Sequence, residues 1–239
     1  MKPIIGIIGR PEITNEDDKV ITLNEKVRQA IIKKGGIPLL IVPNQDIDYL
    51  SFSPHSVRKL TDEEKEELYS LVNICNGLLI PGGSRWYQYD EVIYNYALEK
   101  NMPTLSICAG MQMMGRIENE KENVTEYTNK EIENTTDHFK TNVKYAHKVN
   151  IVDNTKLKDI IKEETISVNS RHRYHVQVLR NLNVSAYSED GLIEAVEYPS
   201  KDFVIGVQWH PETMLDYDEY ANKIFDEFIK KAQKFDKSI

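Results

Sequence analysis

Short apolar segments alternate with longer amphipathic segments through the first half of the chain. Nearly continuous apolar runs, typical of strands buried on both faces of a sheet, occupy residues 4–8, 37–42, 77–80 and 103–107. Apolar residues at helical spacing fill the intervals 24–34, 61–72 and 90–100. Gly35-Gly36 predicts the end of the first of these helices, and Thr61 with Glu64 predicts a capping box at the start of the second. The segments after residue 8 and over 43–60 are polar and are predicted as loops. The alternation predicts a parallel sheet with helices on both faces.

The second half of the chain follows a different pattern. Residues 118–136 are rich in Glu, Asn, Lys and Thr, and we expect a surface excursion there with at most one short helix. Strand-like segments with alternating polarity follow at 147–152, 165–168, 184–187, 192–197 and 203–207. Asp190-Gly191 predicts a hairpin turn between two of these strands, and residues 217–234 form an amphipathic helix.

These elements predict a three-layer α/β sandwich with a mostly parallel central sheet and a small antiparallel β segment. No Gly-rich linker divides the chain. We therefore expect a single domain that covers residues 1–239.

The composition argues against several classes of protein. Thirty Lys and Arg against 38 Asp and Glu give a net charge of −8, whereas proteins that bind a nucleic-acid backbone are more often basic. The apolar runs are far shorter than the ~20 residues that span a bilayer, and residues 1–6 do not resemble a signal peptide. Two cysteines cannot form a disulfide framework. We therefore expect a cytoplasmic protein with no nucleic-acid or membrane partner.

Cys108 is the first candidate for chemistry. It follows a buried strand directly, and Ala109, Gly110 and a helix-capable run come after it. A strand-to-helix turn holds its central side chain in an exposed position and points helix N-terminal amides toward it, which favours a thiolate. The alternative is a buried core cysteine, which is our interpretation of Cys75. The small residues after Cys108 favour a functional role.

His210 and Glu212 form the second candidate. Residues two apart in an extended chain point the same way, and Pro211 biases His210 toward extended backbone angles. A carboxylate beside an imidazole fixes its tautomer and stabilises its protonated form. A strand-end histidine with a surface glutamate is the alternative, but together with a single distant cysteine the pattern favours a nucleophile and its base.

The third candidate is Pro81-Gly82-Gly83, which ends a predicted strand. Glycines at the carboxyl end of a strand let the backbone approach a ligand and direct an N–H toward it. One such amide, from Gly83, together with the amide of Ala109 would form a two-donor oxyanion hole. A simple turn is the alternative.

Three motifs carry a family resemblance: Pro-Gly-Gly (81–83), Ser-Ile-Cys-Ala-Gly-Met-Gln (106–112) and Gly-Val-Gln-Trp-His-Pro-Glu (206–212). In this order and spacing the chain resembles the class I glutamine amidotransferase superfamily. It is more similar to the γ-glutamyl-γ-aminobutyrate hydrolase-like, or peptidase C26-like, branch. Val-Asn-Ser-Arg-His (168–172) and Asp-Gly-Leu-Ile-Glu-Ala-Val-Glu (190–197) support that branch.

The resemblance implies a flavodoxin-like fold and a cysteine-dependent hydrolase of γ-glutamyl amides. The implied triad is Cys108, His210 and Glu212, which would act through a γ-glutamyl thioester without a metal or organic cofactor. The γ-glutamyl half of the substrate is expected near Gly82, Gly83, Gln112, Asn169, Ser170 and His172.

The short loop after Gly83 departs from that branch, as do Ser106 and Ala109 beside the nucleophile. We expect the variable half of the substrate to lie against Arg85 and Trp86, since loops at the carboxyl ends of parallel strands face the ligand crevice. The identity of the amine stays undetermined.

Two arginines and four histidines are further candidates for substrate or metal binding. Arg171 and Arg173 could hold a substrate carboxylate or be simply solvated. His138, His147, His172 and His175 are not spaced along the chain as a set of metal ligands, so no metal site is predicted.

Two rival functions stay open. A glutaminase subunit that supplies ammonia to a partner synthase would share the triad, and a non-catalytic binding module could share the fold. A small γ-glutamyl compound is the expected ligand, and a homodimer stays open as the oligomeric state.

Overall fold

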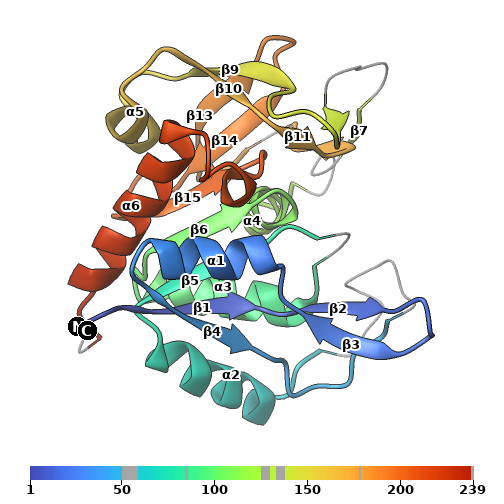
Figure 1. Cartoon of the computed structure of the whole chain (residues 1–239). Helices are drawn as coiled ribbons and strands as arrows, with labels where there is room; N and C mark the ends of the chain where they lie inside the picture. Colours follow the sequence, from blue (N-terminus) through green and yellow to red (C-terminus); the bar gives the residue numbers. More distant parts are fainter. Residues whose placement is uncertain (50–58, 84–85, 125–129, 133–137, 178, 238–239) are drawn as a thin grey trace.

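The structure is a computed structural model that describes residues 1–49, 59–83, 86–124, 130–132, 138–177 and 179–237. Its centre is one nine-stranded sheet, in the order β10-β9-β13-β14-β15-β6-β5-β1-β4 (Figure 1). The parallel half consists of β4 (Ile37–Ile41), β1 (Ile4–Ile8), β5 (Gly77–Ile80), β6 (Thr104–Ile107) and β15 (Val204–Val207). The antiparallel half consists of β14 (Ile193–Glu197), β13 (Asn183–Ser188), β9 (His147–Ile151) and β10 (Thr165–Val168). The antiparallel segment predicted from the sequence thus extends the same sheet.

Helices cover both faces of this sheet, as predicted (Figure 1). One face packs against α1 (Glu25–Lys33), α5 (Lys156–Ile161) and α6 (Glu219–Lys234). The other packs against α2 (Asp62–Ile74), α3 (Gln88–Glu99) and α4 (Ala109–Lys121). The result is the predicted three-layer arrangement.

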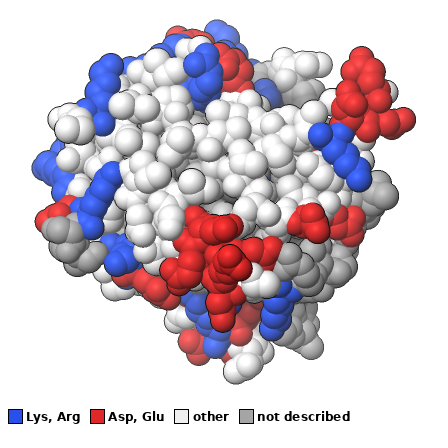
Figure 2. Space-filling model, turned by 90° about the horizontal axis from the view of Figure 1, so that it is seen from below, with Lys and Arg blue, Asp and Glu red and all other residues white. Residues whose placement is uncertain are grey.

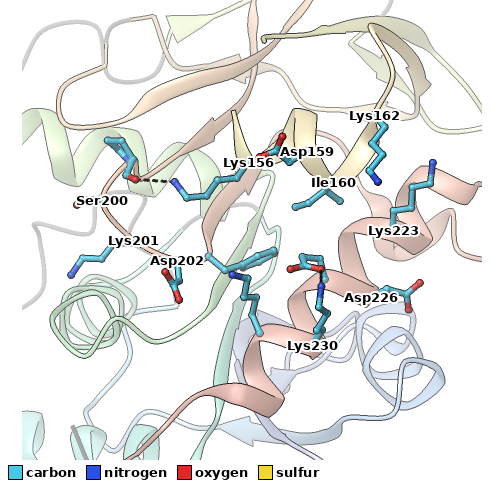
Figure 3. A pocket seen from close by; sticks show the side chains of 14 residues that line it. Lys156, Asp159, Ile160, Lys162, Ser200, Lys201, Asp202, Lys223, Asp226 and Lys230 are labelled. Atoms are coloured by element: carbon cyan, nitrogen blue, oxygen red, sulfur yellow. Dashed lines mark hydrogen bonds and ion pairs between the residues drawn. The ribbon is translucent and has the colours of Figure 1, made fainter. Parts of the chain in front are cut away.

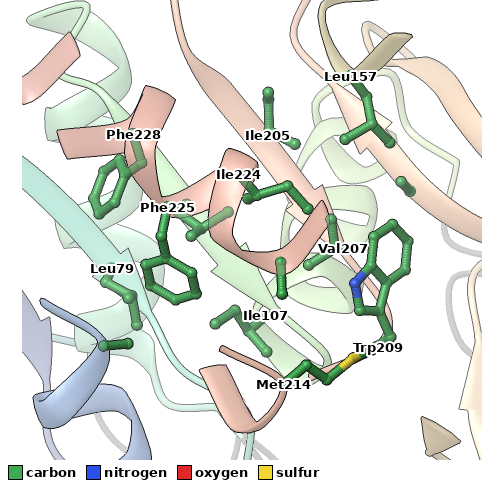
Figure 4. Close-up of a cluster of buried hydrophobic side chains, with 14 of the residues drawn as sticks. Leu79, Ile107, Leu157, Ile205, Val207, Trp209, Met214, Ile224, Phe225 and Phe228 are labelled. Carbon is green, nitrogen blue, oxygen red and sulfur yellow. The ribbon is translucent and has the colours of Figure 1, made fainter. Parts of the chain in front are cut away.

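The core under α6 shows why that helix docks where it does. Phe225 and Phe228 are fully buried and lie against strand residues that include Ile107 and Val207 (Figure 4). Burying a side chain of this size contributes about 1.5–3 kcal/mol. The indole of Trp209, one residue before His210, is buried in the same cluster and anchors the end of β15.

Local signals explain where several helices begin and end. Asn24 and Asp218 accept hydrogen bonds from first-turn amides of α1 and α6, and Thr61 forms the predicted capping box with Glu64. Gly35, with φ of 87°, follows α1 in the left-handed region that favours glycine. The capping box at Thr61 and the glycine stop after α1, both predicted from the sequence, are confirmed.

The hairpin predicted at Asp190-Gly191 is present between β13 and β14, and Gly191 has φ of 86°. Cys75 is fully buried, as expected of a core residue. Burial raises the pKa of its thiol to about 11, so this cysteine is poorly suited to chemistry.

Several elements differ from the sequence predictions. The polar segment after β1 is not a loop but a hairpin of β2 (Arg10–Ile13) and β3 (Lys19–Thr22). Helix α5 was not predicted. Helix α3 begins two residues before the predicted start at Asp90. Its expected apolar residues Ile93 and Ala97 are buried, as are Asp90 itself and Tyr94. Val92 and Tyr96, expected on the same face, pack against the core but are only partly buried.

The polar excursion at 118–136 is also partly wrong. Helix α4 continues through its first residues, and Glu118 and Asn119 are fully buried. Farther on, β7 (Lys130–Glu131) pairs with β12 (Tyr174–His175), and β8 (Phe139–Lys140) pairs with β11 (Ser170–Arg171). The predicted loop 43–60 has neither helix nor strand in its described part, and residues 50–58 of it lie outside the described residues.

Among the described residues, no helix combines the length and apolarity needed to cross a membrane. On the face seen from below, acidic side chains gather near the middle, and most Lys and Arg lie toward the edge (Figure 2).

Candidate active site

The candidate catalytic residues follow three adjacent parallel strands. Pro81 follows β5, Cys108 follows β6, and His210 lies shortly after β15. Because β5, β6 and β15 are neighbours and run in the same direction, their carboxyl ends meet at one edge of the sheet. Ligands of open α/β sheets bind at this edge. The sheet order therefore brings together the three motifs that are far apart in the sequence.

Cys108 sits on the predicted strand-to-helix turn, but it is buried, not in the exposed position expected from the sequence. Its backbone has φ of 51° and ψ of −107°, a conformation that L-residues rarely adopt, and its N–H donates to the carbonyl of Val207 at 2.8 Å. It caps α4, whose first backbone bond runs from the Gln112 N–H to the Cys108 carbonyl at 3.0 Å. First-turn amides such as that of Ala109 have no acceptor within a helix. The turn therefore places the sulfur at the positive end of α4.

Gly110 makes this turn possible. A Cβ at this position would lie 2.6 Å from the backbone oxygen of Ile80, too close for any side chain. The small residue after Cys108 that drew attention in the sequence is thus required by the approach of α4 to β5.

His210 and Glu212 form the predicted pair, but not by the predicted geometry. The Nδ1 atom of His210 lies 2.8 Å from Oε1 of Glu212. The chain between them is not extended, because Pro211–Thr213 forms a short 3-10 helix, η2, with Pro211 in its first turn. The turn, rather than alternation along a strand, directs the carboxylate toward the ring.

The surroundings of His210 favour its protonated form. Burial alone would lower the pKa of the imidazole, but the carboxylate of Glu212 and the hydrogen-bonded sulfur of Cys108 raise it to about 10. The Nδ1 atom faces Glu212, which leaves Nε2 for the sulfur. An imidazolium next to a cysteine is the arrangement that activates the sulfur as a nucleophile.

Asn169 holds the backbone of His210 through two hydrogen bonds. Its Nδ2 donates to the His210 carbonyl at 3.0 Å, and its Oδ1 accepts from the His210 N–H at 2.8 Å. The hydroxyl of Thr213 also donates to the same carbonyl at 3.0 Å. Asn169 was predicted to bind substrate, whereas both polar ends of its side chain are committed to positioning His210.

Two buried glutamines lie beside the nucleophile. Gln208 Nε2 donates to Cys108 Sγ at 3.5 Å. Gln112 Nε2 donates to Gln208 Oε1 at 3.2 Å and to the Tyr174 carbonyl at 2.7 Å. Gln112 was predicted as a substrate contact. The role of Gln208 was missed, although its place two residues before His210 in the same motif was a usable signal.

The loop Pro81-Gly82-Gly83, called the glycine loop below, packs directly against Cys108 and His210. A Cβ at Gly82 would lie 3.0 Å from Cε1 of His210 and 3.4 Å from Cβ of Cys108. Arg10 braces this loop by donating to the Pro81 carbonyl at 2.7 Å, and its guanidinium also pairs with buried Asp90 at 2.5 Å. Arg10 was missed because the segment that holds it was interpreted as a loop.

A cavity of about 390 Å³ opens beside His210 and Glu212. Its walls come from hairpin β2–β3, the start of α1, the glycine loop and β11, and include Arg10, Glu12, Thr22, Asn24, Gly82, Gly83 and Arg171. Arg171 is an exposed cation at this cavity.

The predicted substrate residues are thus distributed over several places. Gly82 and Gly83 line the cavity. Ser170 is buried, and its hydroxyl donates to the His138 carbonyl at 2.8 Å. Trp86 does not line the cavity, and the guanidinium of Arg116 lies 5.5 Å from the centre of its ring. Arg85 lies outside the described residues.

A larger hollow of about 730 Å³ lies elsewhere, between α5, α6 and the turn before β15. Figure 3 shows charged side chains around it, among them Lys156, Lys223 and Asp226. It shares no lining residue with the cavity beside His210. Its charged and open character is that of a solvated surface, so the smaller cavity, which is lined by His210 and Glu212 but not by Cys108, is the candidate substrate site.

One cluster could not be predicted from spacing in the sequence. Ring nitrogens of His138, His147 and His172 lie 3.3, 3.6 and 3.3 Å from Oε1 of Glu194, which is fully buried. Burial would raise the pKa of the Glu194 carboxyl, but the imidazoles hold it at about 2. His175 does not belong to this group.

Comparisons with known proteins identify the family of the chain and several of its relatives. The sequence model of the family described as Peptidase C26 matches residues 3–212. A glutamine amidotransferase-like protein of Rickettsia prowazekii is 29% identical, covering 90% of this chain and 92% of that protein. The γ-glutamyl-γ-aminobutyrate hydrolase of Escherichia coli is 28% identical, covering 97% of this chain and 94% of that enzyme.

Solved structures share the fold. The glutaminase domain of Trypanosoma brucei CTPS, with bound acivicin, superposes with a TM-score of 0.63 at 19% identity, covering 98% of this chain and 95% of that chain. The fold is therefore that of class I glutamine amidotransferases.

Proposed function

Because the chain belongs to the peptidase C26 family, we propose that it hydrolyses the γ-glutamyl amide bond of a small γ-glutamyl compound. The observation that carries this proposal is the arrangement of Cys108, His210 and Glu212 at one sheet edge, with the His210–Glu212 contact at 2.8 Å. The similarity to γ-glutamyl-γ-aminobutyrate hydrolase, which covers 97% of this chain and 94% of that enzyme, supports the same substrate class.

In the proposed reaction, Cys108 Sγ attacks the γ-carbonyl carbon of the substrate. The amides of Gly83 and Ala109 stabilise the oxyanion of the tetrahedral intermediate. His210 donates a proton to the leaving amine as the C–N bond breaks, which leaves a γ-glutamyl thioester on Cys108. Neutral His210 then takes a proton from water, which attacks the thioester and releases glutamate. Glu212 orients His210 throughout.

Arg171 is the proposed contact for the α-carboxylate of the γ-glutamyl group. It is an exposed cation in the wall of the cavity beside His210, and a guanidinium binds a carboxylate through two parallel hydrogen bonds. Arg10 is less suited to this role, since it is engaged with Asp90 and Pro81. Arg173 lies over the ring of Phe139, 4.4 Å from its centre.

The rival is a glutaminase subunit that delivers ammonia to a synthase. It is favoured by the glutamine amidotransferase-like relative, and it would use the same triad. The two functions differ in the amine that leaves and in the need for a partner protein.

The decisive experiment incubates the purified chain with a panel of γ-glutamyl amides, glutamine included, and measures free glutamate and ammonia. The hydrolase predicts rapid glutamate release from at least one γ-glutamyl alkylamide without a partner. The Cys108→Ser variant is the control and should lose at least about a thousandfold in rate. Mass spectrometry of an acid-quenched reaction should find a γ-glutamyl adduct on Cys108. Glutamate release from glutamine alone, with every other amide inert, would favour the rival.

A further inference from the structure

The cluster of His138, His147, His172 and Glu194 has the composition of a metal site. The four side chains offer one ligand atom each, all within 4.8 Å of one another. Their side chains are at most 5% exposed. Three imidazoles and one carboxylate are ligands that suit Zn²⁺.

Four of the six distances between these atoms are close to the edges of a tetrahedron, and the other two, from His147 to His138 and to His172, are at most 4.8 Å. Ligands bound to zinc at 2.0–2.1 Å lie about 3.3 Å from one another along each tetrahedral edge. The three distances from Glu194 Oε1 to the imidazole nitrogens are 3.3, 3.6 and 3.3 Å. The distance between His138 Nδ1 and His172 Nε2 is 3.1 Å. These four lengths suit ligands grouped around one ion.

The outer contacts of the rings set their tautomers. His172 Nδ1 faces the Tyr174 carbonyl at 3.1 Å, and His147 Nδ1 faces the Lys148 carbonyl at 3.2 Å. A carbonyl oxygen can only accept a hydrogen bond, so each of these nitrogens carries the hydrogen. In a neutral ring the other nitrogen, which faces Glu194, then presents its lone pair.

His138 follows the same rule through a carboxylate. Its Nε2 lies 3.1 Å from Oδ2 of Asp190, and its Nδ1 faces the cluster. A histidine that ligates a metal usually donates its other ring N–H to a carboxylate or a backbone carbonyl. All three rings meet this condition.

With all three rings neutral, the interior of the cluster consists of acceptors. Three lone pairs face a carboxylate, and neither oxygen of Glu194 has a hydrogen-bond partner of good geometry among the described residues. Burying an ionised carboxylate without a partner is strongly unfavourable. A bound cation would satisfy all four groups at once.

We propose that His138, His147, His172 and Glu194 bind one Zn²⁺ ion in a structural site. Four protein ligands fill a tetrahedral coordination sphere, which is typical of structural rather than catalytic zinc. The proposal replaces the sequence expectation that the chain has no metal ligands, and it does not depend on the proposed hydrolase activity.

The placement of the ligands suggests what the ion stabilises. Glu194 lies on β14 and His147 on β9, whereas His138 and His172 lie next to the short pair β8–β11. The ion would tie this pair to the main sheet. Asn169, which holds His210, lies three residues before His172, so the site would also support the segment behind the catalytic histidine.

The first test measures metal content. The full chain is stripped with a chelator, incubated with Zn²⁺, dialysed and analysed by elemental mass spectrometry. One Zn²⁺ per chain and a higher Tm than the stripped protein are expected. Cobalt in place of zinc should give the intense visible bands of a tetrahedral ion without the near-ultraviolet band of a thiolate ligand, which separates this site from Cys108.

Matched variants locate the site. Glu194→Gln keeps the side-chain volume, and His147→Gln changes the least buried of the three rings. Both should weaken Zn²⁺ binding at least tenfold and lose the Tm increase. His175→Gln, outside the cluster, should retain both.

Three results would overturn the proposal. They are no Zn²⁺ retained by the wild type, binding unchanged in both cluster variants, or a cobalt spectrum with a thiolate band. The first result would mean that protons, shared between imidazoles and carboxylate, hold the cluster together. Circular dichroism of each variant checks the fold, so lost binding counts in support only where the spectrum matches the wild type.

Discussion

At the scale of single residues, the geometry around His210 separates two kinds of contribution. The side chain of Glu212 contacts the imidazole Nδ1, whereas Asn169 contacts the backbone of the same residue. One partner acts on the charge and tautomer of the ring, and the other acts on its position. Substitutions at the two sites should therefore differ in their kinetic signatures.

Glu212→Gln should lower kcat less than His210→Ala does, by about tenfold or more. The amide can still contact the ring but cannot stabilise its positive charge, whereas the alanine variant lacks the base altogether. Glutamate release under single-turnover conditions measures both effects. Equal losses in the two variants would contradict the separation of an orienting residue from a base.

Asn169→Ala should lower kcat while KM changes little. The substitution removes two partly buried hydrogen bonds to the His210 backbone, at a cost of about 1–3 kcal/mol in unfolding free energy. Steady-state kinetics on one γ-glutamyl amide, with urea unfolding in parallel, tests this. A large rise in KM at constant kcat would instead support the sequence prediction that Asn169 binds the substrate.

At the scale of elements, the turn between β6 and α4 has a steric requirement. Gly110 and Gly115 both lie in α4, but a Cβ at Gly110 would meet backbone oxygen, whereas a Cβ at Gly115 would meet the side chains of Val176 and Leu179. Side chains can shift more easily than a strand. The two glycines form a matched pair for testing the turn.

Gly110→Ala should be more destabilising than Gly115→Ala. Overpacking typically costs 1–3 kcal/mol, and the gain in helix propensity of about 1 kcal/mol is common to both substitutions. Urea denaturation gives the difference in unfolding free energy, and activity should fall more in Gly110→Ala because Cys108 must move. A more stable Gly110→Ala variant would show that β5 yields to the new methyl group.

The residues that line the cavity lead to a prediction about substrate specificity. Arg171 lines it and Trp86 does not. Arg171→Gln should raise KM at least tenfold for substrates with a free α-carboxylate and much less for their α-amides. Trp86→Ala should change KM less than Arg171→Gln does. A strong and substrate-selective effect of Trp86→Ala would instead support the sequence prediction for the loop after Gly83.

Much of the architecture was accessible from the sequence because its signals are local. Apolar runs marked the parallel strands, and caps such as Thr61 marked helix ends. Hairpin β2–β3 was missed because Pro11, Glu12 and Lys19 obscure the alternation expected of strands. The burial of Asp90 in α3 was not predicted, because its charge is compensated by Arg10, a residue 80 positions away.

The same limit applied to the site. Cys108 and the His210–Glu212 pair stood out because their motifs are contiguous. The geometry behind that pair did not, since the 3-10 turn at Pro211 could not be distinguished from an extended segment. The histidine cluster gave no signal at all, because its members come from four segments that only the folded sheet brings together.

At the scale of the whole molecule, the candidate site lies where the sheet changes direction. Strand β15 pairs in parallel with β6, which leads to Cys108, and antiparallel with β14, which carries Glu194. His210 follows this boundary strand. The parallel half thus carries Cys108, the proposed nucleophile. The segment beside the antiparallel half carries Asn169, which holds the backbone of His210, the proposed base. Relative movement of the two halves would misalign the pair.

A charged residue at such a boundary also links global stability to pH. The pKa of His210 is about 10 in the folded chain against an ordinary value of 6.5. A raised pKa means that the folded state binds the proton more tightly than the unfolded state. The resulting stabilisation is complete below about pH 6.5, declines as pH rises, and is lost above about pH 10.

The unfolding free energy of the wild type should therefore fall between about pH 7 and pH 10 more steeply than that of Glu212→Gln. Loss of the carboxylate brings the folded pKa of His210 closer to its ordinary value, so less stabilisation remains to be lost. The slope contributed by one proton is at most about 1.4 kcal/mol per pH unit. Urea denaturation of both proteins across this range isolates the contribution, because the lysines and tyrosines that also titrate there are shared. Parallel curves would mean that Glu212 does not raise the pKa of His210 in the folded chain.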